Sequence, residues 1–534
     1  MDFRSGVLWL SVAIIGAPSV QRTDLPALPP IAEGQIAADT PRFFIVRAKA
    51  GDVISGSIDF TGEAGSFSVS EPNGATIKAF DLEPGANDIG FTAETAGSYR
   101  IEIRVPSGIG KYRVQTTQRT PAERAAATVV IPPTIPYEST SVAKLRDELE
   151  KHEAGALPRF WSAVEAAHGP IIEDIPGDQN NALVTFVWRE AFETHHVRLD
   201  RPPYSGDYYL VHLKGTDVWY RTMKVMKRSR FQYTFQPNYL ASDGAATSTT
   251  DPMNPRVYPA GAPRFASYAS SVLELPAAPD ESWASKTPTR RGAIVDRGFD
   301  SPTLKAELKV KIYTPADYKA GAGQYPLIVL FDGPAYSGVM DAPKTLDNLV
   351  AAGLIRPPVV CFTSSSTSGA DRARNLRFNP AFADAIANEL VPWLRSSFAI
   401  GRRPEDAVIG GFSAGANAGF YIALRHPDIF GNVLSQDGGA GIGHLLPQML
   451  LDAPKGPIRV YMDQSAYELR LESRLPFDEM AVSLDLLATA VRLRDVLRAK
   501  GYDVVYRDVG GAHDPLHFRA TLAEALIALL SPLK

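Results

Sequence analysis

The chain has 534 residues, of which 45% are hydrophobic and 21% are charged, and its formal net charge is −4. This length exceeds what one hydrophobic core usually organises, so we expect two or three domains. The small net charge gives no electrostatic basis for binding nucleic acid. The single cysteine, Cys361, excludes an internal disulfide and leaves no zinc or iron–sulfur ligand spacing. Because it lies in an apolar run, we expect a buried core residue rather than a reactive thiol.

The beginning of the chain has the pattern of a signal peptide. Arg4 precedes an apolar run at residues 6–17, which is too short to span a bilayer comfortably. Ala17 and Ser19 then supply the small-x-small pattern of a cleavage site. We therefore expect residues 1–19 to be a signal peptide and the protein to be periplasmic or secreted. An uncleaved anchor or a buried strand is the alternative, and no membrane span is expected in the mature form.

Two β-rich regions follow. Residues 39–118 contain short alternating runs broken by Gly, Pro and Asn, which predict a small jelly-roll-like β-sandwich serving as a spacer or a weak binding module. Residues 119–158 are predicted to be a linker and a helix, because a stretch rich in Ala, Thr and Pro precedes charges at helical spacing. Aromatic and β-branched alternation over residues 159–290 predicts a second β-sandwich, whose aromatic side chains are mostly expected to pack its core.

Residues 291–534 have the pattern of an α/β domain. Short apolar runs typical of buried strands occur at residues 312–313, 327–331, 359–362, 407–409, 432–435 and 458–462. Helical stretches, such as residues 379–396, lie between several of them. This alternation predicts a mostly parallel sheet flanked by helices, with functional loops at the carboxyl ends of the strands.

The stretch 407–421 is the most informative in the chain. A strand-like run enters the sequence G-x-S-x-G at residues 411–415, and a run with apolar residues at helical spacing leaves it. In this setting the motif predicts a nucleophile elbow, in which flanking glycines permit a strained turn that lifts the Ser413 hydroxyl above the sheet. A purely structural glycine turn is the alternative.

A serine nucleophile needs a base, and the expected base is His513. In the chain order of an α/β-hydrolase the histidine follows the last strand, and residues 502–509 are the last strand-like run. His513 follows two glycines in a turn that can present an imidazole from a loop. His517 is the weaker candidate, because it falls within the next helix, residues 516–530, and is expected to be a half-buried surface histidine.

Two backbone N–H groups are expected to stabilise a tetrahedral oxyanion. One belongs to Ala414, at the start of the helix after the elbow. The other should come from the turn that follows the strand at residues 327–331. Pro334 has no N–H, so Gly333 or Ala335 must supply this group, and the sequence leaves the choice open.

Over residues 159–534 the chain resembles the bacterial enterochelin (ferric enterobactin) esterases, an α/β-hydrolase family. In the β-rich region the resemblance is carried by Phe160-Trp161, Val164, residues 170–173, 184–189, 215–219, 251–255 and 271–276, and Trp283. In the α/β region it is carried by residues 329–333, Arg372, Leu376, Asn379, residues 389–392, the elbow, His426-Pro427, Phe430-Gly431, residues 433–436, Gly511 and His513-Asp514. The resemblance implies an α/β-hydrolase fold preceded by the β-sandwiches, and a serine esterase chemistry.

A triad acid is expected after the strand at residues 458–462, where it would orient the imidazole. Asp463 stands directly at the end of that strand, whereas Glu468 lies nearer the acidic position that the family resemblance suggests. Some members of the family are thought to work with a serine–histidine pair alone, so a site without an acid remains a third possibility.

Arg372, Arg374 and Arg377 form a cluster of guanidinium groups suited to binding substrate. In the family, the counterpart of Arg372 lies by the site. Guanidinium groups suit a ferric tris-catecholate, because it is an anion and its rings can stack on them. A solvated basic loop is the alternative for Arg374 and Arg377.

The motifs predict an exported serine esterase, and the family resemblance implies that it opens ester bonds of a cyclic catecholate trilactone siderophore, in apo or ferric form, and so supports iron release. The alternatives are a related esterase acting on feruloyl, acetyl or depsipeptide esters and, in another class, a noncatalytic siderophore- or glycan-binding protein. No cofactor and no catalytic metal are expected. Any iron would arrive with the substrate, and the oligomeric state stays open.

Overall fold

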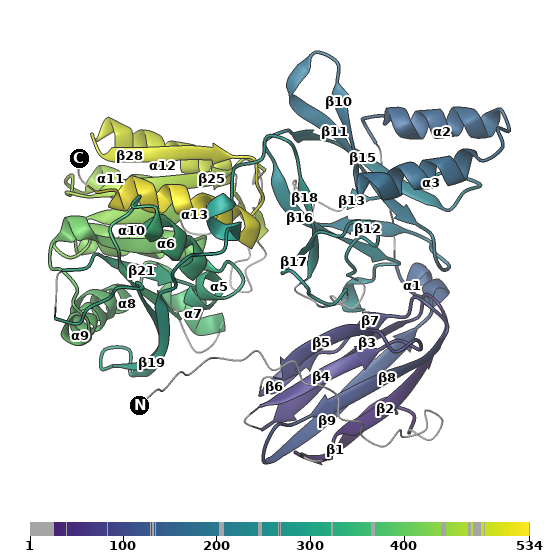
Figure 1. Ribbon diagram of the computed structural model, residues 1–534, viewed down its shortest axis with the longest axis horizontal. Coiled ribbons are helices and arrows are strands. Elements are labelled where there is room, and N and C mark those ends of the chain that lie inside the picture. Colours follow the sequence, from purple (N-terminus) through teal and green to yellow (C-terminus); the bar gives the residue numbers. More distant parts are fainter. Residues whose placement is uncertain are drawn as a thin grey trace.

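The structure is a computed structural model that describes residues 26–532, apart from residues 39, 63, 83, 129, 131–132, 134, 202–207, 244–247, 265, 267–268, 322–323, 365–368, 439–444, 468–470, 474–481 and 485. The expected signal peptide at residues 1–19 lies outside the described residues. Figure 1 shows two β-rich regions beside a mixed α/β region. Among the described helices, none has both the length and the apolar character needed to cross a bilayer.

The first β-rich region consists of two antiparallel sheets. Its strands are β1 (Ile31–Ala37), β2 (Arg42–Ala48), β3 (Val53–Thr61), β4 (Gly65–Ser70), β5 (Thr76–Leu82), β6 (Gly85–Asp88), β7 (Phe91–Thr92), β8 (Gly97–Arg104) and β9 (Ile109–Arg119). One sheet has the order β1-β9-β3-β6, with β7 on β3, and the other has the order β2-β8-β4-β5. Buried and exposed side chains alternate along β8, so every second residue points between the two sheets. Tyr99, Ile101 and Ile103 are buried there and share one core with residues of the other sheet. The sandwich assignment stays a prediction, which this shared core supports.

The second β-rich region follows α1 (Pro121–Ala126), α2 (Thr140–Glu150) and α3 (Ala156–Ala167). Its strands are β10 (Ile171–Ile175), β11 (Asp178–Arg189), β12 (Val197–Asp200), β13 (Tyr208–Tyr209), β14 (Val211–His212), β15 (Val218–Met226), β16 (Arg230–Pro237), β17 (Val257–Tyr258) and β18 (Ser270–Glu274). They form sheets of order β10-β11-β15-β14 and β13-β12-β16-β18-β17. The aromatic residues Phe186, Trp188, Phe231, Tyr233 and Phe235 are buried together, as expected for core packing.

The α/β region contains an eight-stranded sheet of order β19-β20-β22-β21-β23-β24-β25-β28. Its strands are β19 (Ala293–Ser301), β20 (Ala306–Thr314), β21 (Leu327–Phe331), β22 (Val359–Thr363), β23 (Ala407–Phe412), β24 (Asn432–Gln436), β25 (Arg459–Ser465) and β28 (Asp503–Val509). The ladders from β22 to β28 are parallel, and those joining β19, β20 and β22 are antiparallel. The mostly parallel sheet predicted from the sequence is therefore confirmed.

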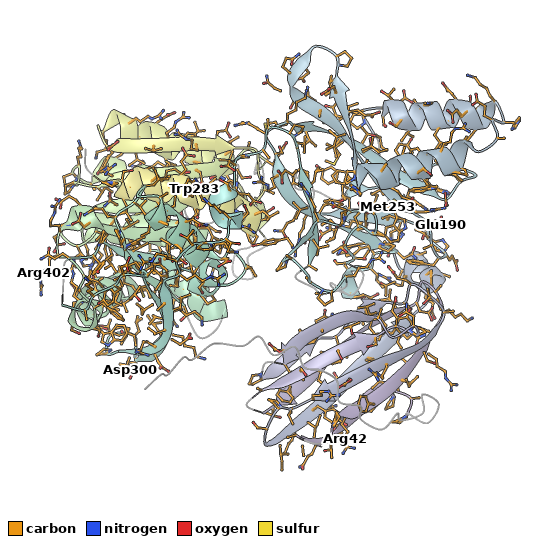
Figure 2. All side chains as sticks on the ribbon, in the orientation of Figure 1. Arg42, Glu190, Met253, Trp283, Asp300 and Arg402 are labelled. Carbon is orange, nitrogen blue, oxygen red and sulfur yellow. The ribbon has the colours of Figure 1, made fainter. Side chains whose placement is uncertain are left out.

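The helices of this region are α4 (Ser282–Ser285), α5 (Gly333–Ser337), α6 (Ala342–Ala351), α7 (Gly369–Asn375), α8 (Pro380–Ala385), α9 (Val391–Ser397), α10 (Ala414–Arg425), α11 (Leu446–Asp452), α12 (Leu486–Ala499) and α13 (Pro515–Leu530). Short turns η2 (Ile386–Leu390) and η3 (Pro404–Asp406) and a small hairpin of β26 (Leu471–Ser473) and β27 (Val482–Leu484) complete it. Although α4 falls within the stretch 159–290, it packs against α6, and Trp283 of α4 lies at the α/β region (Figure 2). The side chain of Asn348 donates to the carbonyl of Trp283 at 2.9 Å.

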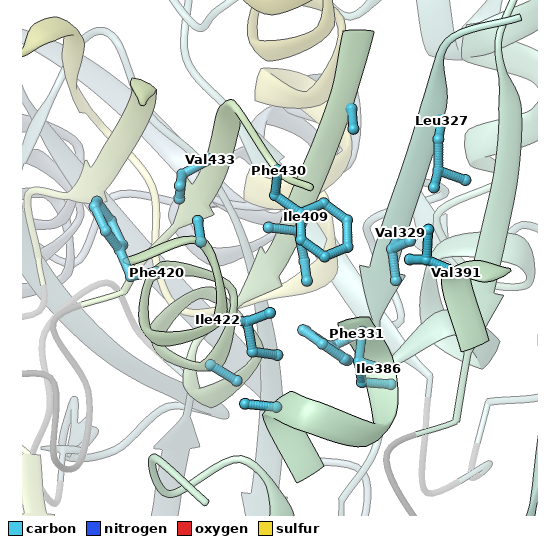
Figure 3. Packing of buried hydrophobic residues seen from close by; sticks show 14 of the residues in the cluster. Leu327, Val329, Phe331, Ile386, Val391, Ile409, Phe420, Ile422, Phe430 and Val433 are labelled. Carbon is cyan, nitrogen blue, oxygen red and sulfur yellow. The ribbon is translucent and has the colours of Figure 1, made fainter. Parts of the chain in front are cut away.

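The central strands β21 and β22 are buried on both faces, and nearly all their residues are apolar. Along β21, Leu327, Val329 and Phe331 point into one core, which also contains residues of α8, α10, α11 and α12 (Figure 3). Ile328 and Leu330 point into the other core, with residues of α5, α6 and α13. Cys361 of β22 is fully buried, as expected.

Candidate active site

The elbow predicted at residues 411–415 is a sharp turn between β23 and α10. Ser413 has φ 53° and ψ −126°, a conformation that L-residues rarely adopt. Two glycines allow β23 to approach β24 and α10 closely. A Cβ on Gly410 would lie 1.8 Å from the carbonyl oxygen of Leu434, and a Cβ on Gly419 would lie 2.7 Å from the Cα of Gly410. The strand, strained turn and helix that the motif requires are therefore all present.

The expected oxyanion donors lie on two helix starts. Ala414 is the first residue of α10, and Gly333 is the first residue of α5, where Asp332 has φ 54°. The Ala335 N–H is already donated to the carbonyl oxygen of Asp332 at 3.0 Å. This hydrogen bond favours Gly333 as the second donor. A Cβ on Gly333 would lie 2.3 Å from the carbonyl carbon of Phe362, so the close approach of α5 to β22 requires glycine.

His513 lies in the loop between β28 and α13, beside the elbow. Its Nδ1 is 3.5 Å from Oδ2 of Asp437, and its side chain is 34% exposed. The ring packs edge-on against Phe518, with 5.4 Å between centroids, and Phe518 stacks on Phe412, the residue before Ser413, at 4.6 Å. Phe518 therefore contacts both the imidazole and the strand that ends at the elbow.

Asp437 is the site residue that the sequence reasoning missed. It follows β24, the strand paired with β23, and Gln436 immediately before it accepts the Ser413 N–H at 2.8 Å. Asp437 therefore neighbours Ser413 across two adjacent strand ends while its carboxylate faces His513. It is fully buried and has φ 48°. The available signal was an acidic residue directly after the strand next to the nucleophile's strand.

Of the two expected triad acids, Asp463 alone lies among the described residues. Asp463 lies within β25, opposite Gln436 of β24, and forms its hydrogen bond with Nε2 of His517 at 2.9 Å. Glu468 lies outside the described residues. His517 is fully buried, so the prediction of a half-buried surface histidine is wrong. It begins the buried face of α13, where Asp514 caps the helix by accepting the N–H groups of Leu516 and His517.

His517 joins two buried acids. Its Nε2 is 2.9 Å from Asp463 and 4.0 Å from Oδ1 of Asp437. Burial alone would lower the pKa of His517, but the carboxylates of Asp437 and Asp463 outweigh burial and raise this pKa to about 9. Burial raises the pKa of Asp463, an effect that the neighbouring His517 opposes.

The same three side chains offer ligand atoms within 4.8 Å of one another, which raises the question of a metal ion. The facing atoms are already engaged, because His517 bonds Asp463 and the N–H of Ser465 is donated to Oδ1 of Asp437. A protonated His517 would place one positive charge between the two carboxylates. Among the described residues, Oδ2 of Asp437, Oδ2 of Asp463 and Nδ1 of His517 make no hydrogen bond.

The second β-rich region supports the loop that carries His513. The N–H of Arg230 is donated to the carbonyl of Gly510 at 3.1 Å, and the N–H of Gln232 to Oδ2 of Asp514 at 3.2 Å. Tyr467, which follows β25, is buried in the core of that β region and accepts the Met226 N–H at 2.8 Å. The loop that carries His513 is therefore bonded to β16 on both sides of the histidine, through Gly510 and through Asp514.

The predicted arginine cluster is divided in the structure. Arg372 forms a bidentate ion pair with Asp332, with both distances 2.6 Å, and this pairing raises the pKa of Arg372. A Cβ on Gly415 would lie 3.4 Å from the Asp332 carboxylate, so the ion pair borders the elbow. Arg374 and Arg377 are exposed. Only Arg372 of the three is tied to the elbow by these contacts, and the substrate-binding role of all three stays a prediction.

Comparisons with known proteins agree with this architecture. A family model described as "Enterochelin esterase, N-terminal" matches residues 183–284, and one described as "Putative esterase" matches residues 301–529. The iron(III) enterobactin esterase of Escherichia coli O6:H1 (strain CFT073) is 28% identical over 347 residues, covering 60% of this chain and 81% of that protein. The protein of the same name from Dickeya dadantii (strain 3937) is 24% identical over 421 residues, covering 70% and 92%.

Solved structures show the same fold. The enterobactin esterase from Shigella flexneri, determined in the presence of enterobactin, superposes with a TM-score of 0.55 at 23% identity and covers 70% of this chain and 97% of that one. The ferric enterobactin esterase from Salmonella typhimurium gives a TM-score of 0.57 at 20% identity, covering 69% and 98%. The α/β region is thus an α/β-hydrolase fold. The two family models match, in order, the β region that supports the loop carrying His513 and the sheet that carries the elbow. Together with the enterobactin esterase relatives, these matches support the enterochelin esterase family.

Proposed function

We propose that the protein is a serine esterase that hydrolyses the ester bonds of a catecholate trilactone siderophore of the enterobactin type through an acyl-enzyme. The observation that carries this proposal is the arrangement at the strand ends. The elbow presents Ser413 directly after β23, and His513 turns Nδ1 toward Asp437 at the end of the neighbouring strand. With Nδ1 turned toward this acid, Nε2 would be the nitrogen that takes the serine proton. The related enterobactin esterases supply the substrate class.

In the first half-reaction, Ser413 Oγ attacks an ester carbonyl and His513 Nε2 takes the hydroxyl proton. The carbonyl oxygen becomes an oxyanion that accepts N–H groups from Ala414 and Gly333. When the tetrahedral intermediate collapses, the ester C–O bond breaks and His513 protonates the leaving serine hydroxyl of the substrate. The acyl group then remains on Ser413.

In the second half-reaction, His513 removes a proton from water, and the resulting oxygen nucleophile attacks the acyl carbonyl. The same two N–H groups stabilise the second oxyanion, and the bond to Ser413 Oγ breaks as His513 returns the proton. Each turn consumes one water and yields one carboxylic acid and one alcohol. Opening of the cyclic trilactone would therefore give a linear trimer first, then dimer and monomer.

The test is product analysis with the apo and ferric siderophore. Wild-type protein, Ser413→Ala and the matched control Ser397→Ala, which changes an exposed serine of α9, are incubated with enterobactin, and linear products are resolved by mass. We expect ordered cleavage by wild type and control and none above background by Ser413→Ala. A feruloyl ester run in parallel distinguishes the substrate class: faster turnover of that ester would contradict the siderophore assignment, and binding of enterobactin without cleavage would contradict the enzyme.

A further inference from the structure

Three strand ends meet beside Ser413, and each brings a titratable side chain. Asp437 follows β24, Asp463 lies on β25, and His513 follows β28. We infer that Asp437, and not Asp463, is the positioning residue that orients His513, and that His517 engages Asp463 so that the two acids have separate tasks. This inference rests on the proposed function, because it concerns how the base of that reaction is held.

The carboxylate of Asp437 is anchored on one side and open toward His513 on the other. Its Oδ1 accepts the backbone N–H of Ser465. Its Oδ2 is buried, and among the described residues it has no hydrogen-bond donor closer than Nδ1 of His513 at 3.5 Å. Hydrogen bonds between catalytic groups often tighten only in the Michaelis complex, so a separation of 3.5 Å is compatible with this pairing.

Asp463 is committed elsewhere. Its Oδ1 is bonded to His517 Nε2 at 2.9 Å, and both side chains are fully buried. Its backbone carbonyl accepts the N–H of Asp437 at 3.1 Å, so Asp463 supports the backbone that carries Asp437. Among the described side chains, the ion pair of His513 is formed with Asp437 and that of Asp463 with His517.

Ser465 bonds both Asp437 and the loop that carries His513. Its N–H is donated to the Asp437 carboxylate, and its hydroxyl is donated to the carbonyl of Gly511, two residues before His513. A shift of β25 would therefore move the acid and the loop together. This contact explains how Asp437 and His513 can keep their relative orientation although they come from different strands.

The charges of the cluster also suit this division. With His517 protonated, the three buried groups Asp437, Asp463 and His517 carry one net negative charge. His513 gains a positive charge when it takes the proton of Ser413, and the charge of Asp437 stabilises that imidazolium. Asp463 is less suited to this effect, because one of its oxygens already bonds the ring of His517.

The test compares two isosteric substitutions in the same cluster. Asp437→Asn keeps the side-chain shape, and asparagine tolerates the positive φ of this position. We expect it to lower kcat by about 10³- to 10⁴-fold with little change in KM, the effect known for loss of the orienting acid. Asp463→Asn retains a hydrogen-bond acceptor for His517 and should lower kcat by less than about tenfold. The exposed control Asp452→Asn should behave as wild type.

A second readout needs no variant. In wild-type protein labelled with nitrogen-15 at histidine, neutral His513 should carry its proton on Nδ1, because that nitrogen faces Asp437. A proton on Nε2 would overturn the inference. So would a folded Asp437→Asn protein with kcat near wild type, or a larger loss in Asp463→Asn than in Asp437→Asn. In each of these cases inactivity of Ser413→Ala would still uphold the esterase itself, whereas an active Ser413→Ala would contradict the proposed function.

Discussion

The imidazole of His517 should carry a proton throughout the neutral pH range. Asp437 and Asp463 face its Nε2, and Asp514 contributes a further negative charge from the start of α13. Burial lowers its pKa, but these acids together raise it to about 9 from the ordinary value of 6.5. At pH 7.5 about 97% of the imidazole would then be charged, against about 9% at the ordinary pKa.

This shift has a stability consequence whose sign is fixed by linkage. The difference between 9 and 6.5 is 2.5 pH units, which at 1.36 kcal/mol per unit corresponds to about 3 kcal/mol. Because the folded state holds the proton more tightly, the stabilisation is fully present below about pH 6.5. It is lost as pH rises through about 9, so the free energy of unfolding should fall over this interval.

The perturbation is His517→Gln, which removes the titrating group and retains a donor for Asp463. Urea unfolding at pH 6 and pH 9.5 should show that wild type loses about 3 kcal/mol more than the variant. Groups that titrate alike in both proteins cancel in this comparison. A carbon-13 titration of the histidine rings gives the pKa directly. A His517 midpoint at or below 6.5, or equal pH dependence in the two proteins, would refute the reasoning.

Three further substitutions test the surroundings of the site. Gly333→Ala should lower kcat by about 100-fold with KM little changed, because the new methyl group displaces α5 and its N–H donor; wild-type kcat would contradict that donor. Tyr467→Phe leaves the buried Met226 N–H without its acceptor and should lower the urea-unfolding free energy by about 1–3 kcal/mol; an unchanged urea midpoint would count against this contact. Arg372→Ala should reduce kcat/KM for ferric enterobactin by about tenfold, and the exposed Arg377→Ala much less; equal losses would argue for a general charge effect.

The strands and the elbow were predictable because their signals are local. The apolar runs of β21 to β25 are short and continuous, and G-x-S-x-G stands between a strand and a helix. These signals depend on neighbours within a few residues, so a single sequence contains them. The prediction of His513 as the base rests instead on chain order, which in an α/β-hydrolase places the base after the last strand.

The acid could not be assigned in this way, because its partner is decided by tertiary packing. Asp463 ends the expected strand, yet a histidine one helical turn into α13 lies closer to it than His513 does. The helix cap at Asp514 fixes that histidine inward, which its sequence position does not reveal. To identify Asp437, one must know that β24 lies beside β23 and that the end of β24 faces the loop after β28.

The pairing of Ser413 with His513 is tested most directly by labelling with an organophosphonate ester, followed by peptide mapping. Wild-type protein should gain one phosphonyl group on the peptide that contains Ser413. His513→Gln should label at least about 100-fold more slowly, because general-base assistance is lost. Labelling of another serine, or an unchanged rate in His513→Gln, would contradict the account.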